Sequence, residues 1–162
     1  MYDSRENCNA IIHTATNTLM CGCDNTTIPN SVMAIEDWAF ADCSLMTSIV
    51  IPESVTSIGD KAFRGCIKLT SVTVGNGVTT IGDNAFDWCF RLASISLGDN
   101  VTSIGDEAFY GCRSISSITV SENNPHYQSI DGSLYSIADA SAAGDSHPGH
   151  GDRADIIVCK KT

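Results

Sequence analysis

Apolar residues recur along the chain in an order that begins at Ile28 and repeats every 23 residues, giving four copies over residues 28–119. Eight positions of the repeat are apolar in every copy. In the second copy they are Ile51, Val55, Ile58, Ala62, Phe63, Cys66, Leu69 and Val72. A unit this short cannot bury its own apolar face and must pack against the next copy. The pattern therefore predicts a solenoid in which equivalent side chains form columns.

Each repeat contains two kinds of local pattern. Ser71–Val74 alternates polar and apolar residues, which is typical of a strand with one buried face. After Gly59-Asp60, the spacing of the Ala62-Phe63 pair and Cys66 fits a short helical turn with the Asp at its N-cap. We therefore expect an α/β solenoid with a parallel β-sheet on one side and short helical turns on the other.

The residues before the repeats predict an N-terminal cap. Residues 10–12 and 19–21 are two β-prone runs separated by a Thr-, Asn- and His-containing break, which indicates a hairpin. Such a hairpin over residues 1–27 would cover the core and the strand edge of the first coil.

The residues after the repeats predict a C-terminal capping unit, residues 120–162. Residues 134–137 and 155–159 indicate the two strands of a hairpin. Between them, residues 138–154 are rich in Gly, Ala, Ser, His and Asp without periodicity, so we expect a long flexible loop. The 162 residues are thus predicted to form one domain, residues 1–162.

The net negative charge of the chain limits the kinds of partner that it can bind. Nine Lys and Arg against 19 Asp and Glu give a formal net charge of −10, which repels nucleic acid and anionic membranes. The first ten residues lack the basic start and apolar core of a signal peptide, and no apolar run approaches the length of a membrane span. We expect no nucleic-acid partner and no membrane insertion.

The eight cysteines follow the repeat more than they follow a disulfide or metal pattern. Cys43, Cys66, Cys89 and Cys112 are 23 residues apart and are expected to act as small buried hydrophobes. The closely spaced Cys21-Gly22-Cys23 would place both thiols on one face of a strand, where buried packing is favoured over a metal or redox role. Whether any pair is oxidised is left open.

The phrase I-P-x-S-V-T-x-I-G-D-x-A-F-x-G-C-x-x-L-T-S-V resembles the BspA-like leucine-rich repeats, and residues 2–12 resemble the hairpin unit interspersed in that family. The resemblance extends over nearly all of the chain before the loop. It implies a right-handed superhelix with its strands on the concave side and its helical turns on the convex side. It also implies export to a bacterial or protozoan surface and adhesion to host proteins, host cells or other microbes.

The chain departs from the family pattern at four positions. Gly75 and Gly98 replace a Pro, Glu36 replaces a Gly, and Trp88 replaces the Gly before the cysteine. These changes bear on the curvature and the convex surface and leave the predicted fold unchanged.

Two surfaces are candidate binding sites. On the concave side, the outward positions of the long strands are Ser48, Val50, Ser71, Thr73, Ser94, Ser96, Ser117 and Thr119. Hydroxyl groups on a rigid sheet can bind a partner, although Ser and Thr also simply suit an exposed β face, and the sequence leaves both open. On the convex side, Trp88, Phe90 and Tyr110 can form an exposed aromatic patch, although packing between coils is the favoured interpretation.

No catalytic residue, cofactor or resident metal is predicted. The sequence has no Gly-x-Ser-x-Gly elbow and no phosphate-binding loop. The column of Asp37, Asp60, Asp83 and Asp106 lacks the calcium-binding pattern of β-rolls and is interpreted as capping. In the region 145–152, the side chains of Asp145, His147, His150 and Asp152 have the chemistry of zinc ligands, but a flexible loop would not preorganise them.

The hypothesis is a non-catalytic binding module, part of a secreted or cell-surface leucine-rich repeat adhesin that binds a protein or glycan on a host or microbial surface. The alternative is a structural spacer within a longer surface protein, with no ligand of its own. The ligand, the length of the parent protein and the oligomeric state do not follow from the sequence.

Overall fold

The computed structural model describes residues 1–4, 8–137 and 156–158. These residues form short β-strands joined by turns, and they contain no helix that could cross a membrane. In chain order the strands are β1 (Tyr2–Asp3), β2 (Ile11–His13), β3 (Thr18–Cys21), β4 (Ala34–Ile35), β5 (Ser48–Ile51), β6 (Ser57–Ile58), β7 (Ser71–Val74), β8 (Thr80–Ile81), β9 (Ser94–Leu97), β10 (Ser103–Ile104), β11 (Ser117–Val120), β12 (Tyr127–Ile130), β13 (Ser133–Ser136) and β14 (Ile156–Val158).

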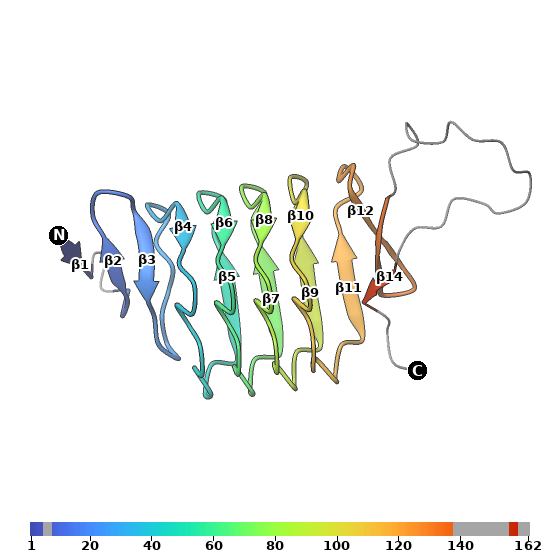
Figure 1. The fold of residues 1–162 in the computed structure, drawn as a ribbon, viewed down its shortest axis with the longest axis horizontal. Coiled ribbons are helices and arrows are strands. Elements are labelled where there is room, and N and C mark those ends of the chain that lie inside the picture. The colour runs from blue at the N-terminus through green and yellow to red at the C-terminus, as the bar shows by residue number, and fades with distance from the viewer. Residues whose placement is uncertain (5–7, 138–155, 159–162) are drawn as a thin grey trace, which may run out of the picture.

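The repeats stack as successive coils along one axis (Figure 1). Each of the first three coils contributes a long strand and then a two-residue strand from the start of the next repeat. The long strands form a four-stranded parallel sheet in the order β11-β9-β7-β5. The two-residue strands β4, β6, β8 and β10 pair in parallel in a seven-stranded sheet that begins with β1, β2 and β3. The predicted solenoid of stacked coils is confirmed.

The core consists of columns of equivalent side chains. The four phenylalanines of the repeats stack face to face, with ring centroids 4.9, 5.2 and 5.5 Å apart and interplanar angles of 5°, 4° and 3°. Every repeated apolar position is buried except Cys43, Ile104 and Cys112, which are partly buried against the same core. Burial of each large side chain stabilises the fold by about 1.5–3 kcal/mol before chain entropy is counted. The predicted columns are therefore confirmed.

The predicted short helical turns are wrong. The segment after each two-residue strand is a series of turns in which two residues have left-handed φ, such as Lys61 at 55° and Gly65 at 73°. Left-handed residues interrupt a right-handed helix. Alternate N–H groups also donate to the following coil, from Lys61 to the carbonyl of Asp83 and from Phe63 to that of Ala85, both at 2.8 Å. Bonds between coils thus replace the bonds of a helix.

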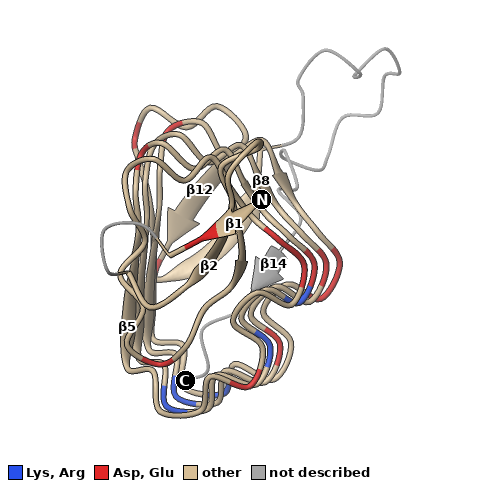
Figure 2. Cartoon of the chain, turned by 90° about the vertical axis from the view of Figure 1, so that its left-hand side faces the viewer, with Lys and Arg blue, Asp and Glu red and all other residues tan. Residues whose placement is uncertain are grey.

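The aspartate column caps the next coil. Asp37 Oδ1 accepts a hydrogen bond from the backbone N–H of Asp60 at 2.7 Å. Asp60 Oδ1 does the same for Asp83, and Asp83 Oδ1 for Asp106, both at 2.8 Å. The sequence predicted that each Asp would cap the turn that it begins. In the structure, each Asp instead caps the equivalent turn of the next coil. Viewed along the stack, acidic residues of successive coils align in a column (Figure 2).

Hairpins cover both ends of the stack. At the N-terminal end, β2 and β3 pair antiparallel as predicted, and β3 then pairs in parallel with β4. At the other end, β13 pairs antiparallel with both β12 and β14, so the predicted second hairpin is present and β12 extends it. The Tyr127 hydroxyl accepts a hydrogen bond from the Ile104 N–H at 3.1 Å, which caps the last two-residue strand.

The cysteines of the repeat lie in one column, as expected. The thiols of Cys66 and Cys89 are buried and donate to the carbonyls of Phe40 and Phe63, both at 3.2 Å. The expected buried packing of Cys21 and Cys23 is wrong, because β3 ends at Cys21 and both thiols are exposed.

Burial, together with the nearby Cys66 and Asp24, raises the pKa of the Cys43 thiol from 9.0 to about 12. The fold therefore favours the protonated thiol, and its contribution to stability is complete below pH 9.0 and is lost as the pH rises toward 12. We expect the free energy of unfolding, measured by urea denaturation, to fall more between about pH 8 and about pH 10 in the wild type than in Cys43→Ala. Cys21→Ala removes an exposed thiol that contributes least to the raised pKa of Cys43, and its pH dependence should stay close to that of the wild type. Equal pH dependence in all three proteins would contradict this account.

Candidate binding surfaces

The first candidate surface is the outward side of the sheet formed by β5, β7, β9 and β11. We call it the hydroxyl face, and its residues are Ser48, Val50, Ser71, Thr73, Ser94, Ser96, Ser117 and Thr119. The strands pair in register, so Ser48, Ser71, Ser94 and Ser117 form one row and the other four residues form a second. All eight side chains are exposed or partly exposed, while the residues between them point into the core. The structure thus brings the eight residues together as the sequence predicts.

The hydroxyl face offers uniform and unsatisfied polar groups. Within the described residues, none of its seven hydroxyls hydrogen-bonds to another protein group. By contrast, the hydroxyls of Thr56 and Thr79, at the neighbouring turns, each donate to a carbonyl of the preceding coil at 3.0 Å. Val50, with 65% of its surface exposed, interrupts the polar character near one edge. These groups can bind only through short side chains on a flat sheet, which makes each contact weak.

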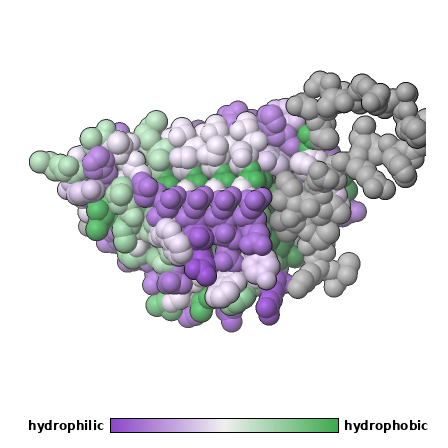
Figure 3. Space-filling view, in the orientation of Figure 1, coloured by the Kyte–Doolittle hydropathy of each residue, from purple (hydrophilic) through white to green (hydrophobic). Residues whose placement is uncertain are grey.

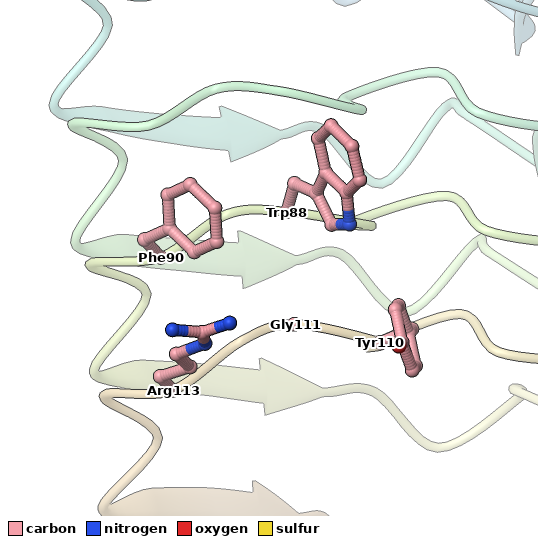
Figure 4. Close-up of a pocket in the computed structure, with 5 residues that line it drawn as sticks. All are labelled: Trp88, Phe90, Tyr110, Gly111 and Arg113. Carbon is pink, nitrogen blue, oxygen red and sulfur yellow. The ribbon is translucent and has the colours of Figure 1, made fainter.

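The second candidate surface is on the turn segments, where we define the aromatic patch as Trp88, Phe90, Tyr110, Gly111 and Arg113. Trp88 and Phe90 come from the third repeat, and the other three residues come from the fourth (Figure 4). The exposed fractions are 47% for Trp88, 38% for Phe90 and 59% for Tyr110, so a large part of each ring faces solvent.

The five residues of the aromatic patch line one hollow of about 420 Å³. The rings of Trp88 and Phe90 lie nearly parallel, at 15°, with centroids 6.4 Å apart. The guanidinium of Arg113 lies 5.5 Å from the Phe90 ring. Gly111 is required here, because a Cβ at that position would approach Trp88 Cδ1 to 2.8 Å. The hollow therefore combines a flat aromatic platform with a positive charge.

Trp88 is also in contact with Arg64, a residue that was not predicted from the sequence to belong to this surface. The guanidinium of Arg64 lies 5.5 Å from the Trp38 ring and 5.2 Å from the Trp88 ring. Its Nε donates to Asp87 Oδ2 at 3.1 Å. The only signal in the sequence was that these residues fall on neighbouring turns of successive repeats. Contacts between side chains 24 and 26 residues apart do not follow from that spacing alone.

The carboxylate of Asp87 is itself unusual. Only 6% of Asp87 is exposed, and its Oδ1 is buried without a hydrogen-bond partner. A buried carboxylate needs a compensating partner, and Arg64 is the one that it has. Arg64 therefore connects the buried charge to the indole surface.

The backbone at Trp88 is strained. Its φ is 58°, in the left-handed region, at a repeat position that Gly65 and Gly111 occupy in the adjacent coils. Trp38, the other tryptophan of the chain, also has a left-handed φ of 61°. Asp42, at the same repeat position as Trp88, also has a left-handed φ, of 60°, so the turn of the coil sets this conformation, which costs a residue with a side chain roughly 1–2 kcal/mol.

Metal-ligand candidates add no third surface within the described residues. In residues 1–4, 8–137 and 156–158, no group of three or more His, Cys, Asp or Glu side chains is placed to hold a metal ion. Asp145, His147, His150 and Asp152, and the rest of the predicted loop, lie outside the described residues.

A family model described as the BspA type leucine rich repeat region matches residues 17–136 as six copies. The pneumococcal vaccine antigen PcpA has a solved structure that is 30% identical with a TM-score of 0.58. The match covers 65% of this chain and 26% of the antigen, so the chain spans about a quarter of that protein's length.

Two further solved structures share the fold. A leucine-rich repeat protein from Bacteroides capillosus is 20% identical with a TM-score of 0.62, over 74% of this chain and 98% of that one. A leucine-rich repeat protein from T. pallidum is 23% identical with a TM-score of 0.54, over 73% of this chain and 67% of that one. No curated protein sequence matches the chain.

The Arg64–Asp87 pair makes a prediction about stability. Arg64→Gln leaves the Asp87 carboxylate buried without its partner, and we expect the free energy of unfolding to fall by about 1–3 kcal/mol. Lys61→Gln, which removes a cation 4.9 Å from the Trp38 ring, should cost less than about 1 kcal/mol. Adding Asp87→Asn to Arg64→Gln should restore part of the loss. Urea denaturation checks this, and equal losses in Arg64→Gln and Lys61→Gln would refute the assigned role.

Proposed function

The chain belongs to the BspA-type leucine-rich repeat proteins, and from that membership we propose that it is a non-catalytic binding module of a bacterial cell-surface protein. A vaccine antigen must be accessible to antibodies, so the likeness to the pneumococcal antigen supports a surface location. The stacked coils provide a rigid surface, which lowers the entropy cost of binding. The proposed partner is a protein or glycan on a host or microbial surface.

The observation that carries this proposal is the hollow of the aromatic patch. Trp, Tyr and Arg are the residues that most often dominate binding energy, and here all three surround one hollow. Rows of like hydropathy, including a strongly hydrophilic one, run along the face drawn in Figure 3. The aromatic patch breaks the repeat instead of following it. Ligand contact is therefore proposed at Trp88, Phe90, Tyr110 and Arg113.

The left-handed φ of Trp88 also supports ligand contact at the aromatic patch. Glycine at the equivalent position of the adjacent coils satisfies the backbone without cost, so the fold does not require an indole there. About half of the indole is exposed, so burial does not account for it either. A contact with a ligand would explain why this position carries Trp.

The hydroxyl face is proposed as a second, weaker contact surface. Its hydroxyls have no protein partners among the described residues, and they repeat in register along the stack. Weak contacts of this kind gain strength when several act together in a longer array. Catalysis is not proposed, since His13 and His126, the histidines within the described range, belong to the capping units and line neither surface.

We expect Trp88→Gly to weaken binding by at least about tenfold while leaving the free energy of unfolding unchanged or higher, because glycine relieves the left-handed strain. The measurement is binding to arrays of glycans and of host extracellular proteins, with thermal denaturation in parallel. The comparison variant carries Ser71→Lys, Ser94→Lys and Ser117→Lys on the hydroxyl face and should lose less affinity than Trp88→Gly, because that surface is proposed to make only the weaker contacts.

The opposite result, with binding lost only in the triple lysine variant, would assign the ligand to the hydroxyl face. Wild-type protein that binds nothing on either array would contradict the proposal and favour a structural spacer.

A further inference from the structure

The turn segments hold all the Lys and Arg side chains of the described residues. Lys and Arg side chains within 1–4, 8–137 and 156–158 are confined to the turns between each two-residue strand and the next long strand. They are Lys61, Arg64, Lys68, Arg91 and Arg113. Viewed along the stack, these basic positions lie on the turn side, apart from the sheet that contains β5 (Figure 2). Asp and Glu side chains share these segments, so the aromatic patch lies where the Lys and Arg of the described residues gather among carboxylates (Figure 2).

Arg113 is the basic residue at the hollow, and its charge is available. Among the described residues, only Arg64 forms an ion pair, with Asp87. Arg113 is exposed and lies beside the Phe90 ring. In a chain of formal charge −10, an arginine without a carboxylate partner at the rim of an aromatic hollow is suited to an anionic ligand group.

We propose that the aromatic patch binds an acidic glycan, with a sugar ring on the platform of Trp88 and Phe90 and its carboxylate paired with Arg113. This inference rests on the proposed binding function and specifies its ligand. The guanidinium of arginine matches a carboxylate through two parallel hydrogen bonds. Figure 4 shows Arg113 and Tyr110 on the coil next to the one that holds Phe90 and Trp88, so a positive charge and a phenol border the same hollow.

The geometry of the platform fits sugar rings. The two aromatic rings are nearly parallel and their centroids are 6.4 Å apart, so together they offer an apolar surface wider than one ring. The C–H faces of a pyranose are apolar and flat, and they stack on aromatic rings. The hollow of about 420 Å³ has room for one or two such rings.

Net charge does not select the ligand by itself, because a chain of −10 repels every polyanion. A uronic-acid glycan adds apolar ring faces that can stack on Trp88 and Phe90. An acidic peptide would place flexible side chains on a flat platform, which costs more entropy on binding. A uronic-acid glycan is therefore the favoured occupant.

The test is calorimetric titration of the chain with short oligomers of galacturonate, mannuronate and glucuronate. The fully methyl-esterified galacturonate oligomer keeps the rings and removes the charge, and polyglutamate provides charge without rings. We expect at least one uronic oligomer to bind, and its affinity to fall about tenfold or more in Arg113→Gln. Lys68→Gln removes the same charge outside the hollow and should change the affinity less than about twofold.

Three results would overturn the inference: no binding to any uronic oligomer, equal binding of the methyl ester, or binding of polyglutamate alone. Each can be separated from failure of the proposed function. If Trp88→Gly still abolishes binding to some other ligand on the arrays, the patch is a binding site of different chemistry. If Trp88→Gly has no effect on any ligand, the patch is not the binding site.

Discussion

The structure depends on contact between equivalent residues of successive coils. Phe63 stacks on Phe40 and Phe86, and the backbone N–H of Phe63 donates to the carbonyl of Ala85 in the next coil. Side-chain columns and backbone bonds therefore run along the same axis and reinforce one another. A single coil has almost no stability of its own, because its apolar side chains are buried only by its neighbours. The two end coils therefore need hairpins to cover them.

The same constraint explains where the chain can vary. The buried columns must repeat, whereas the turn segments need only the correct φ and enough space for the neighbouring coil. Trp88 shows this freedom, because it adopts the left-handed φ of its glycine equivalents and its indole lies over the bare backbone of Gly111. The binding surface is thus built from departures from the repeat, on a scaffold that the repeat makes rigid.

The sequence predicted the parts of the fold that follow directly from periodicity. The phenylalanine column and the in-register hydroxyl face needed only the 23-residue spacing and the alternation within β7. The turns were predicted as helical because spacing cannot show that Lys61 has a left-handed φ or that its N–H bonds to the next coil. The contacts of Arg64 with Trp38 and Trp88 were also missed, since they depend on side-chain directions on three coils.

A double-mutant cycle in the phenylalanine column tests the central claim that neighbouring coils stabilise one another through equivalent side chains. Phe63→Leu and Phe86→Leu, whose rings stack at 5.2 Å, should show a coupling energy of about 0.5–1.5 kcal/mol in urea denaturation. Phe40→Leu and Phe109→Leu, at opposite ends of the column, should be additive within about 0.5 kcal/mol. Additivity of the stacked pair, or equal coupling of the distant pair, would contradict the account.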